Sequence, residues 1–334
     1  MTKLLCAILG LCLIVSGCGW IKDKTYTPSE AEKKFITFCR EEGKVDVVTH
    51  SVGKTLWIYL PLTDPVFEIK ASDEDEKGKR RESALYLLSI EDEFDNRNFN
   101  FTYDIVPNVL SSEPTTYGSS YNETYTKKRQ LIYQGLQESF FALAKDDKSE
   151  KEAPQFFVII VADTVKGIAT KNTVYLPDLK AYMTEALPFE EYYKRELNAI
   201  FGDKNLIGDK KGRSIDYYDV NWADFLTEQI KNRIKFAFSM SDFPPKKDPD
   251  QVVIALAANT LKLYPFHDFD GVYLYNKRQD KEMIFSKEQL KTYEETPAWQ
   301  KDQGKLTIIH FEAPKIPGVE EKPSAKDAPL NKKL

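Results

Sequence analysis

The segment Phe156–Val161, with the sequence FFVIIV, is the strongest constraint on the fold of this chain of 334 residues. All of its side chains are apolar, so both of its faces must be covered by other parts of the protein. A short apolar run rich in β-branched residues is typical of a strand buried at the centre of a sheet. We therefore predict a central strand at Phe156–Val161.

The segment Phe99–Ile105 shows a different pattern, in which apolar and polar residues alternate. This period of two predicts a strand with one face in the core and one face in water. A hairpin that turns at Gly53 should be ended by Pro61, because proline cannot donate to a strand ladder. Strands are expected at Val45–Thr49, Thr55–Leu60, Ala84–Ile90, Phe99–Ile105, Thr173–Leu176, Gly271–Tyr275, Met283–Phe285 and Leu306–Phe311.

Two helix starts are marked by capping boxes, in which a hydroxyl side chain caps the helix and a Glu or Gln follows three residues later. One pairs Thr27 with Glu30 and the other pairs Ser286 with Gln289. Elsewhere apolar residues recur at the helical period, as at Ile132, Leu136 and Phe140. The expected helices span residues 28–42, a region ending near residue 144, and residues 189–200, 222–238, 251–263 and 286–294.

These elements predict an α+β fold with a mostly antiparallel sheet and packed helices. A helix followed by two strands occurs near residues 28–60, 124–176 and 251–285. We interpret this αββ pattern as an arrangement frequent in α+β proteins rather than as a repeat, because the spacings differ. The expected organisation is a leader (1–17), a tether (18–26), two α+β regions (27–110 and 111–312) and a disordered tail (313–334). Charged loops are expected at 72–81 and 146–152.

The composition is that of a globular protein, with 42% hydrophobic and 13% aromatic residues and a formal net charge of −5. Wholesale disorder is disfavoured, because it requires few aromatic residues and a large charge imbalance. The slight acidity gives no reason to expect a nucleic-acid partner.

The N-terminus contains Lys3, an apolar run from Leu4 to Ile14, and the sequence Val15-Ser16-Gly17-Cys18. The run is shorter than the roughly 20 residues that span a bilayer, and it fits the core of a secretory signal. The four residues that end it resemble the lipobox of bacterial lipoproteins. The alternatives are an ordinary secretory signal with a chance cysteine and an uncleaved signal anchor.

The resemblance implies that Cys18 receives a diacylglyceryl group and that a peptidase then cuts before it. Acyl chains such as palmitate, at roughly 0.8 kcal/mol per buried CH₂, would form a nearly permanent membrane anchor. In this family Asp after the cysteine typically retains the protein at the inner membrane. Gly19 and Trp20 stand there instead, which favours the periplasmic face of the outer membrane.

Cys39 would be the cysteine left without a role, because Cys6 and Cys12 leave with the leader and Cys18 carries the lipid. It has no partner for an intramolecular disulfide. Its neighbours are apolar, so we expect a buried core thiol rather than a nucleophile.

No motif predicts a catalytic residue, a metal site or a cofactor. His267, Asp268 and Asp270 are the best metal candidates, but Asp and Gly also suit a turn before a hairpin, which we prefer. Gly53-Lys54-Thr55 lacks the first glycine of a phosphate-binding loop. Ser51 and Lys54 match the spacing of penicillin-recognising enzymes without their context. We interpret Ser51–Lys54 as a turn built from small and polar residues.

Aromatic and basic residues suggest two further surfaces. Trp57 and Tyr59 either stack on sugars or a partner protein, or face a second layer of the core. The helix at 222–238, with three cations near its apolar stripe, is interpreted as packed on a sheet rather than lying on a membrane. His267, Asp268 and Asp270 would support an enzyme if they lined a deep pocket together with His50 or His310.

The sequence therefore favours a lipid-anchored, periplasm-facing envelope protein with a binding, structural or assembly role. Its expected partners are the membrane, through Cys18, and an envelope protein or polymer. The alternatives are an anchored hydrolase of envelope polymers and a solute-binding component of a transporter.

Overall fold

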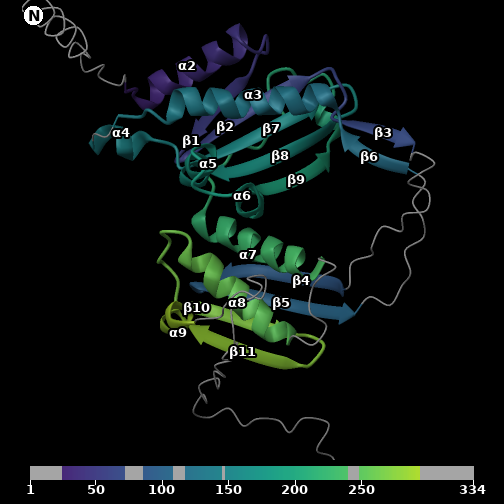
Figure 1. The fold of residues 1–334 in the computed structure, drawn as a ribbon, viewed down its shortest axis with the longest axis vertical. Coiled ribbons are helices and arrows are strands. Elements are labelled where there is room, and N and C mark those ends of the chain that lie inside the picture. Colours follow the sequence, from purple (N-terminus) through teal and green to yellow (C-terminus); the bar gives the residue numbers. More distant parts are fainter. Residues whose placement is uncertain (1–24, 72–85, 108–116, 145–146, 240–247, 294–334) are drawn as a thin grey trace, which may run out of the picture. The chain divides into compact units, whose positions relative to one another are not determined.

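The computed structural model shows an α+β protein (Figure 1). No described helix is long and apolar enough to cross a membrane. The structure describes residues 25–71, 86–107, 117–144, 147–239 and 248–293.

The chain divides into two compact units, each assembled from two separate stretches. Unit 1 consists of residues 1–83 and 109–233, and unit 2 of residues 84–108 and 234–334. The two units differ from the expected division at residue 110, because the hairpin within residues 84–108 pairs with the strand at residues 271–276.

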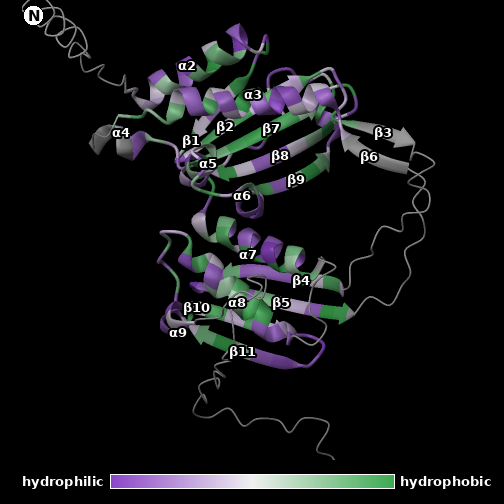
Figure 2. Ribbon diagram, viewed as in Figure 1, coloured by the Kyte–Doolittle hydropathy of each residue, from purple (hydrophilic) through white to green (hydrophobic). Residues whose placement is uncertain are grey.

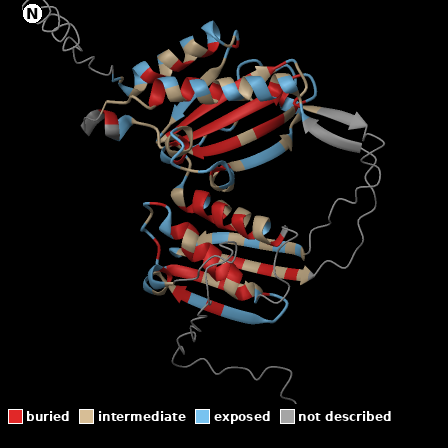
Figure 3. Cartoon of the chain, in the orientation of Figure 1, coloured by how far each residue is buried: buried red, intermediate tan, exposed pale blue. Residues whose placement is uncertain are grey.

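Unit 1 contains a five-stranded sheet in the order β1-β2-β7-β8-β9. β2 and β7 run parallel, and the other neighbouring pairs are antiparallel. All residues of β7 are buried, which confirms the predicted central strand, and Figures 2 and 3 show it as hydrophobic and buried. The strands are β1 (Val48–Val52), β2 (Thr55–Leu62), β7 (Phe156–Asp163), β8 (Ile168–Tyr175) and β9 (Leu197–Gly202).

Helices α2 (Pro28–Glu41) and α3 (Glu123–Phe140) cover one face of this sheet (Figure 1). The predicted capping box starts α2, where Thr27 Oγ1 accepts a hydrogen bond from Glu30 N over 3.3 Å and the Glu30 side chain accepts one from Thr27 N. The apolar layer between the helices and the sheet includes Phe35, Cys39, Leu56, Ile58, Leu60, Ile132, Leu136, Phe140, Phe157 and Ile159.

The remaining elements of unit 1 lie around this sheet. They include a small antiparallel pair, β3 with β6, and the start of α7, which continues into unit 2. Their bounds are β3 (Phe67–Ala71), β6 (Tyr117–Tyr121), α4 (Asp147–Glu152), α5 (Leu176–Met183), α6 (Phe189–Arg195), the 3₁₀ helix η2 (Lys204–Leu206) and α7 (Trp222–Ser239).

Unit 2 contains a four-stranded sheet in the order β11-β10-β5-β4, in which β5 and β10 run parallel. The alternation predicted for β5 is confirmed, since Phe99, Phe101 and Tyr103 are fully buried. The predicted capping box of Ser286 and Gln289 starts α9. The elements are β4 (Tyr86–Asp95), β5 (Asn98–Pro107), α8 (Pro249–Lys262), β10 (Gly271–Asn276), β11 (Lys281–Ser286) and α9 (Lys287–Thr292).

The prediction of an α+β fold is confirmed, but the prediction of mostly antiparallel sheet is wrong, because both sheets are mixed. Each sheet places two hairpins side by side. The strands by which the hairpins meet run parallel, β2 with β7 in one sheet and β5 with β10 in the other. Parallel neighbours require the chain to cross back over the sheet, and helices make part of each crossing here. The three predicted helix–hairpin segments are present as α2-β1-β2, α3-α4-β7-β8 and α8-β10-β11.

Three local predictions are wrong. The helix expected at 189–200 ends at Arg195, and its second half is β9. Residues 147–152, expected in a loop, form α4, because Lys and Glu favour helix. Pro61, expected to end the hairpin, lies inside β2. β2 pairs with β1 only as far as Tyr59, so the missing N–H of Pro61 breaks no hydrogen bond between these two strands.

Several predictions lie outside the described residues. They concern the leader at 1–17, most of the tether, the charged loop at 72–81, the strand at 306–311 and the tail at 313–334.

Candidate functional site

A loop after β9 covers the face of the unit 1 sheet opposite to α2 and α3. Two aromatic side chains of β2 hold it by hydrogen bonds to its main chain. Trp57 Nε1 donates to the Tyr218 carbonyl over 2.7 Å, and the Tyr59 hydroxyl donates to the Asp209 carbonyl over 2.6 Å. The apolar cluster beneath the loop includes Val158, Ile160, Leu206, Ile215, Tyr217 and Val220.

Trp57 and Tyr59 are therefore buried, with exposed fractions of 2% and 1%. Of the two interpretations left open by the sequence, the second core layer is the one observed. The two rings form the base on which the loop lies.

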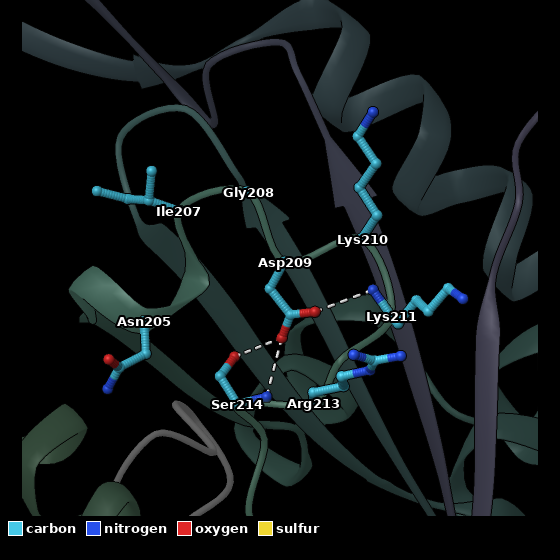
Figure 4. A pocket seen from close by; sticks show the side chains of 8 residues that line it. All are labelled: Asn205, Ile207, Gly208, Asp209, Lys210, Lys211, Arg213 and Ser214. Atoms are coloured by element: carbon cyan, nitrogen blue, oxygen red, sulfur yellow. Dashed lines mark hydrogen bonds between the residues drawn. The ribbon is translucent and has the colours of Figure 1, made fainter.

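Asp209 organises this loop from within. Its carboxylate accepts hydrogen bonds from Lys211 N over 2.9 Å, from Ser214 N over 2.9 Å and from Ser214 Oγ over 2.6 Å. Burial opposes the charged form, but the bonds from Ser214, Lys211 and Arg213 lower the pKa of Asp209 to about 2. The carboxylate is thus ionised near neutral pH, with its oxygens turned toward the loop's own N–H groups (Figure 4).

The loop borders a shallow, open depression of about 680 Å³. Figure 4 shows the Lys211 and Arg213 side chains leaving the loop toward the same side, while Lys210 leaves in a different direction. The depression is lined by Asn205, Ile207, Gly208, Asp209, Lys210, Lys211, Arg213 and Ser214. We call residues 205–214 the cationic loop.

The charge of this loop contrasts with that of the acidic chain. It contains three cations, Lys210, Lys211 and Arg213, and one acid, Asp209. None of the three cations forms an ion pair with a described residue. The other described arginines of unit 1 all do, with nitrogen–oxygen distances of 2.8–3.3 Å, namely Arg40, Arg129, Arg195 and Arg233.

A second polar cluster lies on the α3 side of the sheet around Glu196, whose side chain is 3% exposed. Arg129 Nη2 donates to both of its carboxylate oxygens, over 2.9 and 3.1 Å. The Tyr133 hydroxyl and Asn172 Nδ2 donate to Oε1. Burial and the Glu196 charge raise the pKa of Tyr133 well above its usual value, so this hydroxyl stays a donor. The cluster is therefore a buried ion pair that joins α3 to β8 and to the residue before β9.

Two of the three candidate metal residues, Asp268 and Asp270, form ion pairs with an arginine. Arg97 Nη1 lies 2.6 Å from Asp268 Oδ1, and Arg97 Nε lies 3.2 Å from Asp270 Oδ1. The His267 carbonyl accepts a hydrogen bond from Lys287 Nζ. Within the described ranges no group of three or more His, Cys, Asp or Glu residues could hold a metal ion.

The predicted turn between β1 and β2 is formed by Gly53 and Lys54, since Ser51 and Val52 still pair with β2. Its main chain is bound by a carboxylate of the same chain, since Lys54 N donates to Asp219 Oδ1 over 2.9 Å. His50 precedes this turn, with its ring centroid 4.5 Å from that of Tyr217. The structure thus places His50 in unit 1 and His267 in unit 2, while His310 lies outside the described residues.

Cys39 is fully buried on α2, as predicted, and burial raises the pKa of its thiol to about 12. Cys18 lies outside the described residues. In α7 the stripe residues Leu226, Ile230 and Ile234 are fully buried, and the Trp222 and Phe225 rings each lie 4.9 Å from that of Phe156 on β7. The interpretation of a packed amphipathic helix is confirmed.

Sequence reasoning missed the cationic loop. Its two glycines and three cations are ordinary loop residues, and no spacing among them matches a known motif. Two features that depend on the fold distinguish it. Asp209 is turned inward, and the three cations have no acidic partner within the part of the chain that the structure describes. The chain matches no protein-family model, no curated protein and no solved structure.

Proposed function

We propose that this chain is a lipid-anchored protein of the bacterial cell envelope, with a binding, structural or assembly role at the periplasmic face of the outer membrane. The observation that carries the proposal is the sequence Val15-Ser16-Gly17-Cys18 at the end of the apolar run Leu4–Ile14. A thiolate is the best side-chain nucleophile for accepting a lipid, and the small residues before it suit a narrow peptidase cleft.

The start of the described structure supports a short anchor. Only six residues stand between Cys18 and Thr25, so the seven steps of the chain, at 3.3–3.6 Å each, reach at most about 25 Å. Tyr26 is then fixed to the end of α3, because its N–H donates to Ala142 O over 2.9 Å and its carbonyl accepts from Ala144 N over 2.8 Å. A lipid on Cys18 would therefore hold unit 1 close to the membrane surface.

The ion pairs of three buried carboxylates support a binding or structural role rather than a catalytic one. Glu196 is paired with Arg129, and Asp178 is paired with Arg195 over 2.8 Å. Asp250 lies 2.8 Å from Lys281 Nζ and also accepts bonds from the Tyr103 hydroxyl and Asn276. A hydrolase that works through a pair of carboxylates needs one that exchanges its proton with substrate, whereas these carboxylates join elements of the fold.

The proposal is tested by labelling cells with radioactive palmitate while they express the full chain. We expect label on the protein, accumulation of a lipidated precursor when globomycin blocks the lipoprotein peptidase, and loss of label in Cys18→Ser. Cys12→Ser is the matched control, because it removes a leader cysteine outside the lipobox and should keep the label. Labelling that survives in Cys18→Ser would refute the proposal.

A further inference from the structure

We propose that the cationic loop, residues 205–214, is a binding site for a phosphate monoester. The inference concerns unit 1 alone and does not depend on the lipid anchor. It begins from Arg213, whose guanidinium has no carboxylate within ion-pair distance among the described residues, unlike the other described arginines of that unit. An unpaired guanidinium presents a planar fork of donors that matches two phosphate oxygens.

The loop has its own acid, but Asp209 does not neutralise the three cations by direct pairing. Its oxygens are engaged by Lys211 N, Ser214 N and Ser214 Oγ. The ammonium of Lys211 and the guanidinium of Arg213 therefore stay available to a ligand. They leave the loop toward the same side, so one anion could contact both (Figure 4).

The main chain of the loop is fixed before any ligand arrives, which lowers the entropy cost of binding. The Tyr59 hydroxyl donates to the Asp209 carbonyl, and the Tyr217 hydroxyl donates to the Gly212 carbonyl over 2.8 Å. Gly212 has a φ of +65°, and a side chain there would collide with Tyr217. Two buried or half-buried tyrosines thus set the shape of the loop from below.

The charge of the loop selects the class of ligand. Three cations against one carboxylate leave a net charge of +2, and a phosphate monoester carries about −1.5 to −2 at neutral pH. A simple carboxylate would balance only half of this charge. Arg213 and Lys211 are assigned to the phosphate oxygens, while Lys210, which points elsewhere, adds to the local potential.

The first test is calorimetric titration of the full chain, in neutral maltoside micelles, with glycerol phosphate at constant ionic strength. We expect saturable binding that weakens at least tenfold in Lys211→Ala/Arg213→Ala. The matched control is Lys33→Ala/Lys235→Ala, which removes two exposed cations elsewhere and should change the affinity less than twofold. Circular dichroism would confirm that both variants are folded.

The source of the phosphate is distinguished by adding phosphatidic acid or phosphatidylcholine to the micelles. If a lipid headgroup is the ligand, phosphatidic acid weakens binding of glycerol phosphate at least fivefold and phosphatidylcholine does not. If free phosphate monoesters are the ligand, neither lipid competes. The inference is overturned if the unchanged chain does not bind glycerol phosphate, or if the two double variants lose affinity equally, which would indicate general electrostatic attraction.

Discussion

Thr55 and Asp219 join the β1–β2 turn to the segment that leads into α7. The Thr55 hydroxyl donates to Asp219 Oδ1 over 2.8 Å and accepts from Val220 N over 2.7 Å. Thr55 is 1% exposed, so its hydroxyl makes both bonds from a buried position. The tripeptide Gly53-Lys54-Thr55, which imitates part of a phosphate-binding loop, is therefore bound internally by a carboxylate.

Thr55→Val should destabilise unit 1 by about 1–2 kcal/mol. The substitution keeps the shape of the side chain but removes its hydroxyl, leaving Val220 N and Asp219 Oδ1 without that partner. Urea unfolding measures the change. The control is Thr63→Val, because Thr63 is exposed and has no hydrogen bond with a described residue. Equal losses of unfolding free energy in Thr55→Val and Thr63→Val would contradict the two hydrogen bonds assigned to the Thr55 hydroxyl.

Gly53→Ala should be more harmful than Gly208→Ala. Both glycines have positive φ, +54° and +76°, so alanine strains the backbone at each, by about 1 kcal/mol. At Gly53 the added methyl would also overlap the Asp219 carboxylate, whereas at Gly208 nothing lies within 4 Å of it. The difference between the two unfolding free energies isolates the overlap, and a value near zero would show that Asp219 does not lie over this turn.

Removal of Glu196 should cost about 2–4 kcal/mol, because Glu196→Ala leaves Arg129 partly buried without its carboxylate. A double-mutant cycle with Arg129→Ala measures the coupling. The control pair on the same helix is Lys127 with Glu123, at 2.6 Å, with side chains 72% and 79% exposed. That pair should contribute below about 0.5 kcal/mol. Similar coupling in both cycles would contradict the structural role given to Glu196.

Asp250 should make unit 2 sensitive to acid. Burial opposes its charge, but bonds from Lys281, Tyr103 and Asn276 lower the pKa of Asp250 below its usual value. The stabilisation is therefore complete above the unfolded pKa of about 3.9 and is lost as pH falls further toward the folded pKa.

Asp250→Asn removes that titrating group, so its unfolding free energy should change less between pH 6 and pH 2.5 than that of the unchanged chain. Tyr103→Phe should give an intermediate result, because it removes one of the three donors. Equal pH dependence in the unchanged chain and in Asp250→Asn would show that this carboxylate does not contribute.

Local signals in the sequence predicted much of the fold. The capping boxes at Thr27 and Ser286 are correct, because each depends on residues three apart. The buried strand at 156–161 is correct, because its apolar composition leaves no face for water. Cys39 was predicted to be buried from its apolar neighbours, and it is.

Long-range pairing could not be predicted. β2 and β7 are far apart in the chain, and nothing in the sequence of either strand indicates that they pair in parallel. The helix expected through residue 200 stops before Glu196, because this side chain turns inward to Arg129 and the chain then pairs with β8. The cationic loop was missed for the same reason, since its main chain is bound at Asp209 by Tyr59, which lies 150 residues away in the sequence.

The central claim is that Cys18 carries the anchor, and mass spectrometry of the N-terminal peptide of protein isolated from membranes tests it most directly. We predict a peptide that begins at Cys18 and carries a diacylglyceryl group on Sγ. A peptide that begins at another residue, or that contains Cys18 with a free thiol, would contradict the claim.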